Sequence, residues 1–168
     1  MRLALFVSLL MVYALQAQSN SSSDDYQELG PMQYRWEHRG DRVFFEVISP
    51  DDGWIVLGLN QQDNIVGASL FFGGQRNEEQ YFAERYVTGF GENSSFAELG
   101  WASKIADVSV TTTADDRERL SFSLPHQPVA DYEYDLSPGQ SVWLILAYSV
   151  SDDLGHHSRF RQHVQVRL

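Results

Sequence analysis

The chain has 168 residues, with 12 Lys and Arg against 23 Asp and Glu and a formal net charge of −11. This length suits one domain, and 43% hydrophobic with 13% aromatic residues is enough to form a core. The acidic excess, with Lys104 as the single lysine, excludes the basic surface needed for binding nucleic acid or anionic lipid. The lack of cysteine excludes disulfides, thiolate metal sites, cysteine nucleophiles and covalent haem attachment.

The N-terminus resembles a secretory signal peptide. Arg2 precedes an apolar run over residues 3–15, and Ala17 supplies a small residue at the cleavage position. The apolar run is too short to cross a membrane, which takes about 20 residues. We therefore expect an exported protein, with the Gram-negative periplasm as the preferred compartment. The predicted organisation is a signal peptide over 1–17, a flexible polar leader over 18–31 and a single domain over 32–168.

Alternation of apolar and polar residues predicts a chain of β-strands after the leader. Gly, Pro, Asn and Asp separate these short segments, which is typical of an all-β, antiparallel β-sandwich. No segment keeps a period of 3.6 residues, so we expect helical structure only as short turns in the connections 89–107 and 125–139. The predicted strands are 34–38, 42–49, 53–60, 69–73, 80–88, 108–113, 119–124, 141–150 and 159–168.

Two of these strands carry more specific patterns. Residues 53–60, with the sequence GWIVLGLN, are apolar on both faces, which predicts a central strand with Trp54 in the core. The last strand places Arg159 and Arg161 on its polar face. These arginines form either cross-strand ion pairs with acidic neighbours or a cationic site for carboxylates, such as haem propionates or an acidic sugar.

The adjacent residues His156 and His157 lie in a tight loop between the last two predicted strands. Loops on a rigid scaffold often carry binding residues, and neutral imidazole is a good ligand for haem iron, zinc or copper. Adjacent side chains point apart in an extended chain, so we expect one of the two to enter a given site. The alternative is an exposed pair without a partner. We expect His38, His126 and His163 on the surface.

The sequence contains none of the common catalytic motifs. Gly-x-Ser-x-Gly, His-Glu-x-x-His, Gly-x-Gly-x-x-Gly and Walker-type loops are all absent. A binding module is therefore favoured over a stand-alone enzyme.

The chain from about residue 33 to its end resembles a DOMON domain. The resemblance rests on a Gly-Trp strand (GWIVLGLN, 53–60) followed by IVGA (65–68), and on VWLILAY (142–148) followed by an acidic turn and HHSR (156–159). It implies an immunoglobulin-like β-sandwich, most often extracytoplasmic, that binds haem or sugar.

In the cytochrome members of that family, a methionine after the Gly-Trp strand and a histidine near the C-terminus ligate b-type haem. The resemblance places His156 or His157 at the histidine position, with Arg159 or Arg161 near the propionates. It places Ile65 at the methionine position, where an aliphatic side chain cannot ligate iron.

Three hypotheses remain from the sequence. The first is a module that binds haem b for electron transfer or sensing. The second is a metal-free module for carbohydrate or another small ligand, using aromatic residues of the segment 90–101. The third is a domain that docks on another envelope protein through an apolar patch. The acidic surface favours a basic redox or binding partner.

Overall fold

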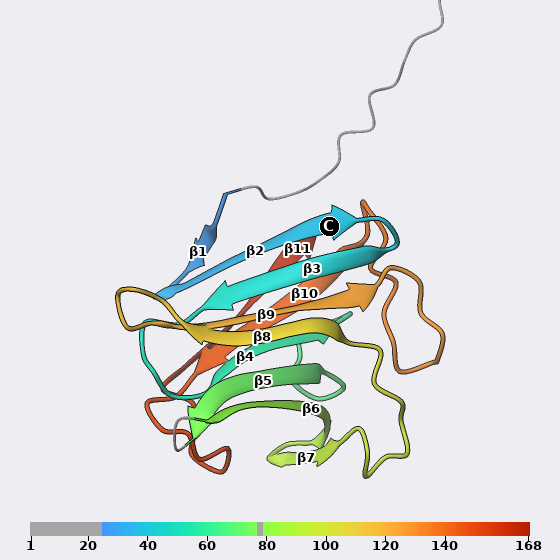
Figure 1. Cartoon of the computed structure of the whole chain (residues 1–168). Helices are drawn as coiled ribbons and strands as arrows, with labels where there is room; N and C mark the ends of the chain where they lie inside the picture. The colour runs from blue at the N-terminus through green and yellow to red at the C-terminus, as the bar shows by residue number, and fades with distance from the viewer. Residues whose placement is uncertain (1–24, 77–78) are drawn as a thin grey trace, which may run out of the picture.

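The structure, a computed structural model, describes residues 25–76 and 79–168 and consists of two antiparallel sheets. In Figure 1 the five-stranded sheet lies in front of β10 and β11 of the six-stranded sheet. The predicted β-sandwich is confirmed. In spatial order, the five-stranded sheet contains β1 (Gln27–Leu29), β2 (Met32–Arg39), β3 (Arg42–Ile48), β9 (Glu118–Pro125) and β8 (Ala106–Thr112). The six-stranded sheet contains β11 (Phe160–Arg167), β10 (Ser141–Tyr148), β4 (Ile55–Asn60), β5 (Ser69–Arg76), β6 (Glu79–Gly89) and β7 (Glu92–Ser95).

The main core fills the space between the two sheets. Phe122 of β9 lies 5.8 Å from Phe45 of β3 and 4.7 Å from Phe71 of β5, measured between ring centroids, so aromatic side chains of both sheets meet here. Met32 is fully buried in the same cluster. Large rings that interlock across the interface fix how the two sheets face each other.

A second apolar cluster lies on the outer face of the six-stranded sheet. Strand β4 alternates between the two clusters: Ile55 and Leu57 point into the main core, whereas Val56 points outward. All six residues of β4 are buried, as predicted from its sequence. The outer face of an antiparallel sheet is commonly solvated, so an apolar outer face needs a cover. Part of the cover comes from loop residues Ile65, Val66 and Leu154.

The start of the domain differs from the prediction. Within the expected leader, β1 pairs with β2, and Tyr34 donates a hydrogen bond of 2.8 Å to Gln27 Oε1. Leu29 packs against the main core, which explains why this short segment joins the sheet. The predicted signal peptide lies outside the described residues. The described part of the chain contains no helix long and apolar enough to span a membrane.

The connection predicted over 89–107 contains a strand that the sequence pattern does not reveal. Strand β7 pairs with the end of β6 through a two-residue turn at Phe90 and Gly91, where Gly91 has φ 77, a region that glycine enters without steric cost. A run of turns follows over residues 96–100 where we expected a short helical turn.

Candidate functional site

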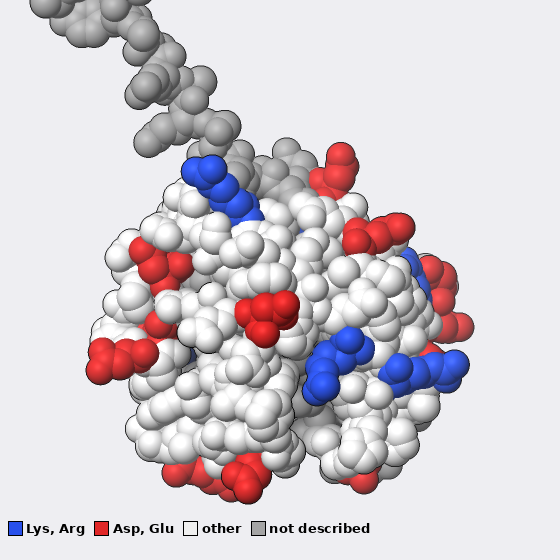
Figure 2. All heavy atoms as spheres, turned by 180° about the vertical axis from the view of Figure 1, so that it is seen from behind, with Lys and Arg blue, Asp and Glu red and all other residues white. Residues whose placement is uncertain are grey.

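The outer apolar cluster forms the floor of an open groove of about 480 Å³. This volume lies within the range of small-molecule sites, about 300–1,000 Å³. Figure 2 views the molecule from behind, the side on which the six-stranded sheet has its outer face. Most of this surface is uncharged, with scattered acidic side chains and, at the lower right, two neighbouring basic side chains. The floor is formed by side chains from four strands and from the residue before β4: Trp54, Val56, Leu70, Phe72, Val87, Ile145 and Ala147.

Two loops border the groove, one at each end of the strands that form its floor. In the pairing of β10 with β4, Tyr148 lies opposite Ile55 and Trp143 opposite Asn60. The loop that follows β10 therefore begins beside the start of β4, whereas the loop that follows β4 begins at its other end. Six extended residues span about 20 Å. The histidine loop and the loop of Ile65 thus face each other along the groove.

The histidine loop is fastened to the sheet. The Trp54 indole donates a hydrogen bond of 3.1 Å to the Asp153 carbonyl, and the amide of the fully buried Ser149 donates to the Trp54 carbonyl at 2.9 Å. Within the loop, the His156 amide donates to the Asp153 carbonyl at 2.9 Å. Leu154 packs onto the outer cluster. These contacts give a loop with two exposed histidines a fixed backbone.

The ring of His156 has one nitrogen fixed by the loop itself. Its Nδ1 lies 3.0 Å from the carbonyl of His157 and 3.1 Å from Ser149 Oγ. A carbonyl oxygen only accepts hydrogen bonds, so this contact places the proton on Nδ1 and leaves the lone pair on Nε2. This tautomer is the one that metal-ligating histidines commonly adopt, with the remote N–H held by a backbone carbonyl or carboxylate.

Both predicted histidines line the groove, but only His156 has its ring oriented by hydrogen bonds. The ring of His157 makes none within the described residues. The other histidines form pairs elsewhere. His38 Nδ1 lies 2.8 Å from His126 Nε2, and burial together with the charge of His126 lowers the pKa of His38.

The two candidate arginines lie in different surroundings. Arg161 lines the groove, whereas Arg159 is not part of its wall. In the part of the chain that the structure describes, neither arginine forms an ion pair with an acidic side chain. Arg161 is an exposed cation at the groove. It is therefore available to a carboxylate of a ligand.

The far end of the groove is aliphatic and rigidly held. Ile65 lines it, in a loop that Asn60 fixes through hydrogen bonds from Nδ2 to the carbonyls of Asn64 at 2.6 Å and Val66 at 3.2 Å. The same loop is tied to β11 by the 2.8 Å contact between Asp63 and His163. The side chain of Ile65 packs against the outer cluster and offers no donor atom.

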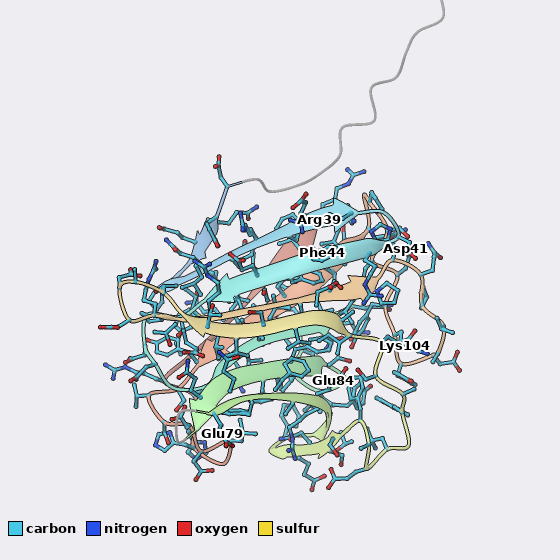
Figure 3. All side chains as sticks on the ribbon, in the orientation of Figure 1. Arg39, Asp41, Phe44, Glu79, Glu84 and Lys104 are labelled. Atoms are coloured by element: carbon cyan, nitrogen blue, oxygen red, sulfur yellow. The ribbon has the colours of Figure 1, made fainter. Side chains whose placement is uncertain are left out.

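Most aromatic rings of the segment proposed for sugar binding pack against neighbouring aromatic rings. Trp101 stacks on Tyr132 with ring centroids 3.9 Å apart and planes at 3°, and Phe96 meets both rings edge-on. The cavity beside them, lined by Glu84 and Lys104 (Figure 3), has about 40 Å³, room for a few waters. Burial raises the pKa of Glu84 there.

Phe90, the first residue of the segment proposed for ligand binding, lines the groove at the turn between β6 and β7 and is 85% exposed. Its place between two glycines indicates a turn, but it does not indicate that the turn borders this groove. Among the described residues, no cluster of three or more His, Asp or Glu side chains could hold a metal ion.

The fold has a counterpart among solved structures. The cytochrome b domain of pyranose dehydrogenase from Coprinopsis cinerea aligns with 81% of this chain and 76% of its own, with a TM-score of 0.57 and 11% sequence identity. The two share a fold. The cytochrome domain of cellobiose dehydrogenase from Myriococcum thermophilum aligns over 82% of this chain and 74% of its own, with a TM-score of 0.47 and 9% identity. No family model matches the chain.

Proposed function

We propose that the protein is a DOMON-type module that binds b-type haem without a covalent bond, in the groove on the six-stranded sheet, and serves electron transfer or sensing. His156 would hold the haem iron through Nε2. The observation that carries this proposal is an imidazole whose Nδ1 is held by a backbone carbonyl at 3.0 Å, at one end of an apolar groove. The shared fold with a cytochrome b domain supports it.

The residues of the groove fit the parts of a haem. The floor of Trp54, Phe72 and aliphatic side chains suits an apolar macrocycle, and Arg161 suits the propionate carboxylates. The chain has no cysteine for covalent attachment. When bound, haem supplies a one-electron iron couple. The protein orients the imidazole, keeps water from the floor and leaves the groove open on one side.

His156 is preferred over His157 because its ring is already oriented. Holding an imidazole in one rotamer and one tautomer removes an entropic cost that a free ring pays on binding. His156 Nδ1 contacts the carbonyl of His157 in its own loop. It also contacts the hydroxyl of Ser149, a buried residue directly after β10. His157 has no such contact and remains the second candidate.

We further propose that the protein is exported after cleavage near Ala17 and acts with a basic partner. The net charge of −11 favours association with a positively charged surface and disfavours nucleic acid. The groove opens to solvent beside the exposed Phe90, which offers a partner an apolar contact next to the bound ligand.

Titration of the purified protein with haemin tests the proposal. We expect a Soret band that saturates at one haem per chain and shifts on reduction with dithionite. In His156→Ala the affinity falls about 100-fold or more, since even the partners of metal ligands contribute about 10–100-fold. His126→Ala is the matched control, because this histidine contacts His38 and does not line the groove.

Two results would contradict the proposal at different levels. If the wild type takes up no haem, the haem function is wrong. If His156→Ala and His157→Ala each keep the full spectrum and affinity, haem binds but neither histidine is its ligand.

A further inference from the structure

A carboxylate points into the sandwich from strand β6. In the pairing of β5 with β6, Glu84 lies directly opposite Phe71, and Phe82 lies opposite Gly73. Residues directly opposite each other on paired strands share a face of the sheet. Phe71 is 3% exposed in the main core and Phe82 packs against that core, so Glu84 belongs to the inner face. The alternation of β6 calls for an apolar residue at this position, and a carboxylate there needs its own explanation.

The carboxylate of Glu84 is only partly satisfied. Burial raises its pKa, and a hydrogen bond from Ser103 offsets this in part. Its Oε1 is buried and accepts no hydrogen bond from the described residues. Glu133, in the connection after β9, is similar: Oε2 accepts from the amides of Val129 and Ala130, whereas Oε1 is buried and accepts no hydrogen bond within the same part of the chain. Buried carboxylate oxygens without a donor are costly, and native proteins contain few of them.

Both carboxylates line the cavity of about 40 Å³ beside the stacked pair of Trp101 and Tyr132. Lys104 is the single cation among the residues that line it, and it forms no ion pair with Glu84 or Glu133 in the described part of the chain. Figure 3 shows Glu84 and Lys104 at the same side of the sandwich. Four buried apolar side chains complete the lining: Leu59, Phe71, Leu124 and Leu136.

The charge, volume and apolar lining of this cavity restrict what it binds. Two carboxylates and one ammonium leave one negative charge, which a single monovalent cation balances. The volume of about 40 Å³ has room for about three groups of the size of a water molecule. The apolar side chains favour a cation with a short alkyl group over a bare ion. A primary ammonium carries three N–H donors, enough to reach both unpartnered oxygens.

We propose that this cavity is a binding site for a small primary alkylammonium ion. Its N–H groups donate to Oε1 of Glu84 and of Glu133, and its alkyl group contacts the apolar side chains. The site lies apart from the groove, since the two have no lining residue in common, and it does not depend on haem.

Titration of the ¹⁵N-labelled protein with ethylammonium at about pH 8, followed by NMR, is the test; at this pH an alkylammonium stays protonated. Ligands this small reach about millimolar affinity at best, so the titration extends to about 100 mM at constant ionic strength. We expect saturable shifts of the Val129 and Ala130 amides, which donate to Glu133. Ethanol, which lacks the charge, and tetramethylammonium, which lacks N–H donors, should bind at least about tenfold more weakly.

Three variants assign the roles of the charged groups. In Glu84→Gln the affinity for ethylammonium should fall about tenfold or more, because a charge-assisted hydrogen bond is lost. Glu46→Gln is the matched control: burial also raises the pKa of this carboxyl, but it pairs with Arg35 on the other sheet, so the affinity should be unchanged. Lys104→Met should strengthen binding, because it removes a like charge from the lining.

Each outcome supports or overturns the inference. The absence of saturable shifts with ethylammonium overturns it. Equal affinity for ethanol, or an unchanged affinity in Glu84→Gln, shows that the carboxylates do not select a cation and also overturns it. Equal affinity for the ammonium ion overturns the role of the alkyl group. Should Glu84→Gln fold poorly by circular dichroism, Glu133→Gln replaces it with the same expected loss. None of these results bears on haem uptake, so the proposed function is tested separately.

Discussion

Strands with alternating side chains form both sheets, yet the outer face of one sheet is charged and the outer face of the other is apolar. On the five-stranded sheet, Glu46 Oε1 forms ion pairs with Arg35 at 3.3 Å and with Arg119 at 4.0 Å. The Arg39 guanidinium lies 4.6 Å from the ring centroid of Phe44. Figure 3 shows Arg39 and Phe44 on neighbouring strands of this face. Charged side chains that pair across strands complete that surface, and it needs no further cover.

The six-stranded sheet presents an apolar face instead, centred on Trp54 and Phe72, whose rings meet at 5.6 Å. Two loops cover it in part and leave a groove. In an antiparallel sandwich, the second sheet covers only one face of a strand. A strand that is apolar on both faces, such as β4, therefore indicates that loops or a ligand cover the outer face.

The largest expected effect is that of Trp54→Ala. Its side chain is 4% exposed and its indole holds the histidine loop, so we expect a loss of about 3–5 kcal/mol in the free energy of unfolding, measured with urea. Phe44→Ala on the other outer face is the matched control and should cost about 1 kcal/mol. Equal losses would show that the two faces do not differ in energy.

An intermediate effect is expected from Glu118, which lies where loops of both sheets meet. It is 1% exposed, and burial, together with Asp152 and Asp52, raises its pKa to about 7. The folded state therefore holds this proton more tightly than the unfolded state, whose carboxyl titrates near 4.5. The protonated carboxyl of Glu118 therefore stabilises the folded state fully below about pH 4.5. As pH rises to about 7, this contribution is lost and the free energy of unfolding falls by about 3 kcal/mol.

Urea unfolding at pH 5 and pH 8 measures this loss. In Glu118→Gln the pH dependence over this range should shrink by about that amount, because the amide does not ionise. Glu79→Gln is the control, since Glu79 is exposed on β6. An unchanged pH profile in Glu118→Gln would show that another group carries the dependence.

The smallest effect separates the two arginines at the end of the chain. We expect Arg161→Ala to weaken haemin binding by about fivefold or less, since an exposed cation contributes about 1 kcal/mol at most to a charge pair. Arg159→Ala should leave the affinity unchanged, because Arg159 does not line the groove. If Arg159→Ala loses more haemin affinity than Arg161→Ala, the carboxylates of the ligand contact Arg159, outside the groove.

The fold could be predicted from the sequence because each strand carries its own alternation, and β4 in particular has apolar residues on both faces. Strands β1 and β7 were missed since three or four residues are too short for a period to show. Their pairing depends on tertiary contacts, such as Leu29 on the core.

The site was predictable only in part. The histidine pair stands out in the sequence, but which ring is oriented depends on Ser149, seven residues away from His156. Arg159 and Arg161 are equivalent in the strand pattern, and only the position of the groove distinguishes them. The pairing of His38 with His126 joins residues 88 positions apart, which no local pattern reveals.

The sheet edges have a consequence for how the protein behaves at high concentration. Strands β1 and β7 are very short, β8 has an irregular register between Ala106 and Ser109, and β11 exposes arginines along its length. Short, bulged and charged edges resist the addition of strands from another molecule. The described part of the chain can therefore keep an apolar groove open to solvent while its own borders discourage self-association into fibrils.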